Sequence, residues 1–84
     1  MLFVSPTEEQ LGFWMKDTLI PLDIIIAKSD GTIVQIFHNA KPMDETRLLS
    51  SVPAKAALEV NGGTADALGI KEGDRLESKD LGGS

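Results

Sequence analysis

The most apolar stretch of the chain covers residues 22–28, and a second stretch of similar character covers residues 32–39. Both are rich in the β-branched and aromatic residues that favour strands. Asp30 and Gly31 stand between them, and an Asp-Gly pair between two such runs is typical of a tight hairpin, because glycine adopts positive φ at no steric cost. The pattern therefore predicts an antiparallel hairpin with strands over residues 22–28 and 32–39.

Both sides of this hairpin are apolar. Leu22, Ile24 and Ile26 would face one side of the first strand, and Ile25 and Ala27 would face the other. A sheet that has one face in water shows a cleaner alternation of apolar and polar residues. We therefore expect the second face to be covered by a barrel wall, a helix or another copy of the chain.

The remaining segments predict further short strands and one long connection. The predicted strands cover residues 13–18, 54–60 and 75–77. Residues 40–53 hold two prolines and a polar cluster, so we expect an irregular connection there, of a length that is often functional.

Residues 64–69 predict one short helix, with the Thr64 hydroxyl as N-cap and Gly69 as the stop. The fold class predicted from these elements is α+β, a small, mainly antiparallel, β-barrel-like domain of four to six strands with one short helix. We assign residues 1–78 to this single domain and residues 79–84 to a flexible C-terminal tail or a cloning remnant.

Composition narrows the class of protein. The chain has 84 residues, of which 42% are hydrophobic and 25% charged, which is typical of one soluble globular domain. No apolar run approaches the roughly 18 residues that span a bilayer, and the apolar start of the chain is too short for a signal peptide. These features predict no membrane span and leave the compartment open.

Charge and side-chain chemistry exclude further classes. The net charge is −5, and the 8 basic residues are spread singly along the chain, so we expect no nucleic-acid partner. The chain has no cysteine and one histidine, His38, which rules out thiolate zinc sites and histidine-rich metal sites. No phosphate loop or dinucleotide fingerprint is present. We therefore expect no metal and no cofactor.

Four segments taken together resemble one family. They are MLFV at Met1–Val4, FWMKDTLIPLDIII at Phe13–Ile26, LEVNGGTADALGI at Leu58–Ile70 and GDRL at Gly73–Leu76. Their order and spacing are similar to those of domain of unknown function family 192, an uncharacterised family of prokaryotic proteins. The resemblance implies a small β-barrel-type α+β domain, often secreted or membrane-anchored, with no settled biochemical activity.

The chain departs from the family pattern in two ways. The family signature is Trp-Met-Lys-Asn-Thr followed by Pro-Leu-Asp, and here Asp17 replaces the asparagine. Family members usually carry a further N-terminal portion with a Gly-Leu-Met motif and at least one strand. The resemblance therefore implies either a shortened domain or a strand edge that another chain covers. Together with the two apolar hairpin faces, this leads us to expect self-association as a dimer.

Four residues form the candidate ligand site: Trp14, Lys16, Asp23 and Glu59. Asp23 stands inside the most apolar stretch, where a carboxyl of raised pKa could act as an acid or base. Its alternative role is structural, as an acceptor of backbone N–H bonds near Pro21 or as a partner of Lys16. The sequence leaves both roles open.

The other three site residues have similar pairs of interpretations. Trp14 could stack on a planar ligand such as a sugar, or it could belong to the core. Lys16 could bind an anion, and Glu59 could lie near Lys16 or Asp23 across a barrel mouth or be a solvated strand residue. His38 is expected to be solvated.

The leading functional hypothesis is a non-enzymatic binding or interaction module, with a small molecule as one candidate ligand. The alternative is a small acid/base enzyme that uses Asp23 or Glu59, with Lys16 holding an anionic substrate. A third class is a purely structural oligomerising unit. Convergence of Lys16, Asp23 and Glu59 in an open pocket would favour the enzyme, whereas scattered or sealed side chains would not.

Overall fold

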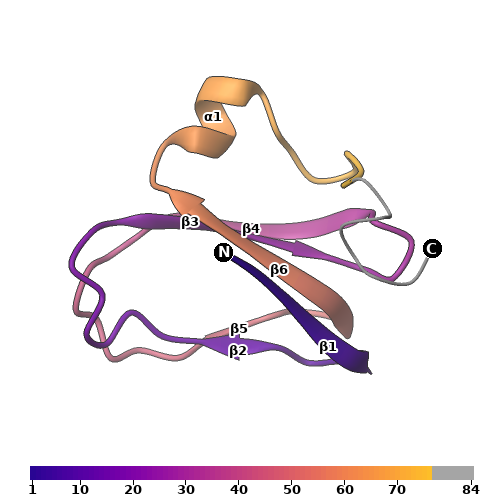
Figure 1. The fold of residues 1–84 in the computed structure, drawn as a ribbon, viewed down its shortest axis with the longest axis horizontal. Coiled ribbons are helices and arrows are strands. Elements are labelled where there is room, and N and C mark those ends of the chain that lie inside the picture. Colours follow the sequence, from indigo (N-terminus) through magenta and orange to yellow (C-terminus); the bar gives the residue numbers. More distant parts are fainter. Residues whose placement is uncertain (77–84) are drawn as a thin grey trace.

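The structure is a computed structural model that describes residues 1–76. These residues form two β layers and one short helix. The elements are β1 (Leu2–Glu9), β2 (Gly12–Phe13), β3 (Leu22–Ala27), β4 (Ile33–Ala40), β5 (Leu48–Leu49), β6 (Ala54–Asn61) and α1 (Thr64–Leu68). An antiparallel four-stranded sheet has the order β1-β6-β3-β4, and β2 pairs with β5 in a second layer (Figure 1). The tail predicted for residues 79–84 lies outside the described residues.

Strands β3 and β4 form the hairpin that the sequence predicts. The N–H of Lys28 donates to the carbonyl of Thr32, and the N–H of Gly31 donates to the carbonyl of Lys28, each at 2.9 Å. Gly31 has a φ of 90°, and the Asp30 carboxylate accepts the Thr32 N–H at 2.9 Å. The Asp-Gly pair therefore closes the hairpin by the mechanism expected of it.

Strand β3 lies inside the sheet, and its side chains divide between two apolar clusters. Ile24 and Ile26 belong to one cluster and Ile25 to the other, and all three are fully buried. The first cluster is closed by side chains from the β2–β5 side, namely Leu11, Phe13, Met15 and Leu48. The second is closed by side chains from α1 and the segment after it, namely Ala65, Ile70 and Leu76.

The two covering layers lie on opposite faces of the four-stranded sheet, with α1 on one side and β2 and β5 on the other (Figure 1). Each apolar face of the hairpin is therefore covered by the same chain. The expected dimer rested in part on an uncovered face of the hairpin. Because both faces are covered, this argument for self-association no longer applies.

The predicted α+β class, mainly antiparallel with one short helix, is confirmed. The four-stranded sheet is open rather than closed into a barrel, because β1 and β4 are its two edges. The strand predicted over residues 13–18 ends at Phe13, because Thr18 turns back and donates its N–H to the Met15 carbonyl at 3.0 Å. Of the strand predicted over residues 75–77, the described part forms a single bridge from Arg75 to Thr32.

A glycine substitution tests how the hairpin turn meets the segment after α1. A Cβ added at Gly31 would lie 2.6 Å from the Leu76 carbonyl oxygen, whereas one added at Gly73 would meet no atom within 4 Å. The φ angle is 90° at Gly31 and 96° at Gly73, so both substitutions carry similar backbone strain. We expect Gly31→Ala to lower the free energy of unfolding by about 2–4 kcal/mol and Gly73→Ala by about 1–2 kcal/mol, measured by urea denaturation. Equal losses would contradict the close approach.

Candidate functional site

The carboxylate of Asp23 lies beneath the surface, where its side chain is 0% exposed. Its Oδ1 accepts the N–H of Asn39 at 2.8 Å and the N–H of Gly63 at 3.2 Å. Its Oδ2 accepts the N–H of Ala65 at 2.8 Å. One carboxylate on β3 therefore joins the end of β4 to the start of α1.

These contacts determine the charge state of Asp23. Burial raises the pKa of its carboxyl, but the N–H donors of Asn39, Ala65 and Gly63, together with nearby His38, lower this pKa by more. The net pKa lies below the ordinary value of an aspartate. The group is therefore ionised at neutral pH and buried, and its hydrogen bonds are made to backbone N–H groups of the chain.

The same carboxylate replaces the helix cap that the sequence predicts. The residue at the N-cap position is Gly63, with φ of 91° and no side-chain cap bond of its own. Thr64 is the first residue of α1 rather than its cap. The predicted stop is confirmed, because Gly69 is the C-cap with φ of 69°. The local pattern suggested a hydroxyl cap, but the capping acceptor comes from a strand some forty residues away.

Trp14 and Lys16 lie together on a loop that follows β2. The Lys16 ammonium nitrogen is 5.2 Å from the centroid of the Trp14 ring, within the range of a cation–π contact. Trp14 is half exposed, while its neighbour Met15 is buried in the core. The alternation along residues 14–16 therefore anchors the loop through Met15 and leaves Trp14 and Lys16 at the surface.

Backbone hydrogen bonds join this loop to the one before β5. The N–H of Met15 donates to the Asp44 carbonyl at 3.1 Å, and the N–H of Met43 donates to the Thr18 carbonyl at 3.0 Å. Asp17 and Met43 both have left-handed φ, at 65° and 63°. The two loops run beside each other at the left of Figure 1. Their conformations are thus fixed by each other and by buried Met15.

Large apolar side chains are exposed on this pair of loops. We call the exposed set the tip surface, and it consists of Trp14, Lys16, Leu19, Ile20 and Met43. Leu19 is 80% exposed, and the other three apolar members are about half exposed. Every member lies within two residues of one of the backbone bonds that join the loops, so the set is concentrated at one end of the molecule.

Glu59, the fourth predicted site residue, lies on β6 opposite Ile24 of β3 and is partly buried. Within residues 1–76 its carboxylate makes no hydrogen bond or ion pair, and it is joined to neither Lys16 nor Asp23. The structure thus brings Trp14 and Lys16 together and buries Asp23 under three backbone amides, and within residues 1–76 Glu59 is bonded to neither Lys16 nor Asp23.

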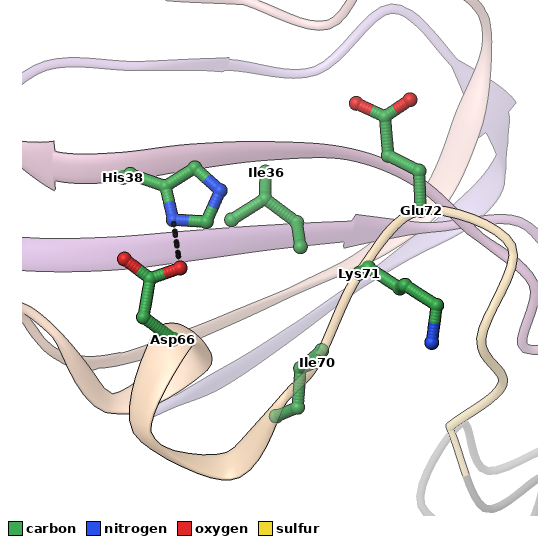
Figure 2. Close-up of a pocket in the computed structure, with 6 residues that line it drawn as sticks. All are labelled: Ile36, His38, Asp66, Ile70, Lys71 and Glu72. Atoms are coloured by element: carbon green, nitrogen blue, oxygen red, sulfur yellow. Dashed lines mark ion pairs between the residues drawn. The ribbon is translucent and has the colours of Figure 1, made fainter.

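A cleft of about 360 Å³ lies between β4 and the segment that contains α1. We call it the α1–β4 cleft, and it is lined by Ile36, His38, Asp66, Ile70, Lys71 and Glu72 (Figure 2). His38 Nδ1 is 3.7 Å from Asp66 Oδ1, and the dashed line in Figure 2 marks this pair. The side chain of His38, which is expected to be solvated, is 45% exposed. No local pattern places it against Asp66, because the helix reaches β4 only in the folded chain.

No group of three or more histidine and carboxylate side chains within residues 1–76 is placed to hold a metal ion. No helix in the same part of the chain is long and apolar enough to cross a membrane.

The fold and these surfaces define a small α+β domain with an open antiparallel sheet and a helix that is held by a buried carboxylate. The model of domain of unknown function family 192 (DUF192), described as "Uncharacterized ACR", matches residues 1–78. The chain belongs to this family, and the resemblance found in the sequence is confirmed.

Two solved structures are similar to the chain. A protein of unknown function from Novosphingobium aromaticivorans DSM 12444 has a TM-score of 0.88 and 47% identity, over 92% of this chain and 55% of that one. A candidate transcription regulator from Sinorhizobium meliloti 1021 has a TM-score of 0.92 and 43% identity, over 96% of this chain and 63% of that one. The chain thus spans less than two thirds of either protein. Comparison with curated proteins gives no significant match.

An isosteric substitution tests whether the hydrogen bonds of Asp23 stabilise the folded chain. In Asp23→Asn the side-chain NH₂ cannot accept a hydrogen bond, so at least one of the buried N–H groups loses its acceptor. We expect the free energy of unfolding to fall by about 2–4 kcal/mol at neutral pH, measured by urea denaturation. Asp17→Asn makes the same chemical change at an exposed residue, and we expect it to alter stability by less than about 0.5 kcal/mol. Equal effects would contradict the assignment.

The lowered pKa of Asp23 also predicts a pH dependence. Because the folded pKa lies below the unfolded value of about 3.9, the stabilisation is fully present above that pH and is lost as the pH falls through the folded pKa. The stability difference between the wild type and Asp23→Asn should be constant from about pH 7 to 5 and shrink below about pH 4. Urea midpoints measured across this range test it, and a difference that grows on acidification would contradict it.

Proposed function

We propose that this domain is a non-enzymatic interaction module that binds a partner protein through the tip surface. The observation that carries the proposal is the exposure of Trp14, Leu19, Ile20 and Met43 on a pair of loops that are held by backbone hydrogen bonds. Large apolar side chains that gather on a fixed surface are typical of binding sites. Trp and Met are also enriched at the centres of protein interfaces.

The charges around the tip surface favour a protein as the partner. Lys16, Asp17, Lys41 and Asp44 lie on the same two loops and bring both signs of charge beside the apolar side chains. A mixed polar rim around an apolar centre is the usual anatomy of a protein interface. An anionic membrane would instead be repelled by a chain of net charge −5, and the same charge argues against DNA.

The acid/base alternative receives no support from the positions of its residues. The Asp23 carboxylate is saturated by backbone amides, and the Lys16 ammonium lies over the Trp14 ring. An acid/base pair needs a carboxyl within hydrogen-bond reach of a substrate proton, and a fully buried, ionised Asp23 does not provide one. Within residues 1–76, the partly buried Glu59 has no ion pair with Lys16, the residue that was to hold the substrate.

The proposal can be tested by site-specific crosslinking in cells that naturally make the protein. With the photoreactive residue p-benzoylphenylalanine at position 19, we expect a discrete adduct with one other protein, and we expect Trp14→Ala to abolish it. Leu68 on α1 is a matched control, because it is 70% exposed against 80% for Leu19 and lies outside the tip surface. Lipid adducts, no adduct, or equal yields from positions 19 and 68 would each overturn the proposal.

A second candidate function is self-association, which we propose would use the outer edge of β1. Met1, Leu2, Phe3 and Val4 are all exposed there. Met1 and Glu59 exchange backbone hydrogen bonds at 2.7 and 2.8 Å, so the antiparallel alternation directs the amides of Leu2 and Val4 away from β6. An apolar strand edge with unpaired amides can pair with the same edge of a second copy.

Light scattering tests this second candidate. The wild-type chain should have twice its 9.0 kDa mass in solution, and Val4→Lys should reduce it to one chain, because an edge lysine blocks strand pairing. Val52→Lys is the control, since Val52 has the same 39% exposure and lies in a loop. A wild-type chain that remains monomeric at high concentration would refute this dimer.

A further inference from the structure

The α1–β4 cleft is separate from the tip surface, and its size suits a small ligand. Its volume of about 360 Å³ falls within the range of small-molecule pockets. Ile36 of β4 and Ile70, which follows α1, give it an apolar middle. Four ionisable side chains complete its lining, so a ligand there would meet aliphatic and charged groups together.

The charges of the cleft do not balance. The Lys71 ammonium pairs with Asp74 at 3.5 Å, and in Figure 2 it points away from the carboxylate of Glu72. Within residues 1–76 the Glu72 carboxylate has no ion pair. Asp66 has His38 beside it, and this contact compensates the Asp66 charge only when the imidazole is protonated. Asp66 and Glu72 therefore give the cleft two carboxylates that, within residues 1–76, form no ion pair with a lysine or an arginine.

The two carboxylates stand at different ends of the cleft. Figure 2 shows Asp66 beside His38 at one end, Glu72 at the other, and Ile36 between them. The order along the cleft is thus anionic, apolar and anionic. A chemically matched ligand has a positive charge at one or both ends of a short aliphatic chain.

We propose that the α1–β4 cleft binds an alkylammonium group. The ammonium is held by Asp66 with the imidazole of His38 beside it, and the aliphatic chain packs on Ile36 and Ile70. In a diamine, the second ammonium reaches Glu72. The same chemistry is available from a free aliphatic diamine and from a lysine side chain of a peptide, and the test separates these sources.

The experiment is an NMR titration of the ¹⁵N-labelled chain with 1,5-diaminopentane, N-acetyl-lysine methylamide and pentane-1,5-diol at equal ionic strength. We expect saturable shifts of the Ile36, His38 and Ile70 amides with at least one of the two amines, and binding of the neutral diol at least about tenfold weaker. Saturation by the diamine alone identifies a free diamine as the ligand, whereas equal saturation by the lysine derivative identifies a lysine side chain.

Variants make the result specific to the cleft. Asp66→Asn and Glu72→Gln should each weaken diamine binding about fivefold, because each removes one exposed charge contact. Glu45→Gln removes an exposed carboxylate outside the cleft and should leave binding unchanged. Glu72→Gln lies outside α1, so it remains informative if Asp66→Asn disturbs the helix. Unsaturable shifts with both amines, or equal effects of Glu45→Gln and the two cleft variants, would overturn the proposal.

Discussion

The ionised carboxylate of Asp23 and its three backbone donors hold the start of α1 to the end of β4. A buried charge is costly unless it is fully hydrogen-bonded, and here Asn39, Gly63 and Ala65 supply the bonds. Helix α1 has only five residues, too few to be stable by its own hydrogen bonds. Its position therefore depends on this carboxylate and on the burial of Ala65 against Ile25.

This constraint separates the two surfaces that we propose as binding sites. On one side of the sheet, Asp23 fixes α1, and with it the position of Asp66 opposite His38 and the geometry of the cleft. On the other side, buried Met15 fixes the loop that exposes Trp14. The two surfaces use different faces of the same central strand, so a change in one does not require a change in the other. Such independence is consistent with the two separate binding surfaces that we propose.

The sequence predicted the parts of the fold that local chemistry dictates. The Asp30-Gly31 turn, the alternating faces of β3 and the Gly69 stop all follow from short-range patterns, and the structure has them. The strand predicted beyond Phe13 was wrong, because its apolar alternation is also satisfied by a loop that buries Met15 and bonds to Asp44. A local pattern does not distinguish these two outcomes.

The candidate site was less predictable for the same reason. Trp14 and Lys16, two of the predicted site residues, lie close together, because residues two apart in a chain stay close in most conformations. The role of Asp23 depends on donors from two distant segments, and the exposure of Leu19 and Ile20 depends on which surface the loop presents. Neither property is visible in the local sequence. Whether Glu59 lies near Lys16 or Asp23 or is a solvated strand residue also depends on tertiary structure, and within residues 1–76 Glu59 forms no ion pair with either residue.

Amide hydrogen exchange is the most direct test of the hydrogen bonds between the Asp23 carboxylate and the start of α1. First-turn amides of a short helix normally exchange quickly because they have no helical acceptor. If the carboxylate accepts them, Ala65 and Gly63 should be strongly protected in the wild type and lose that protection in Asp23→Asn, while Ile25 in the sheet stays protected. Rapid exchange of the Ala65 amide in the wild type, or protection unchanged in the variant, would contradict the account.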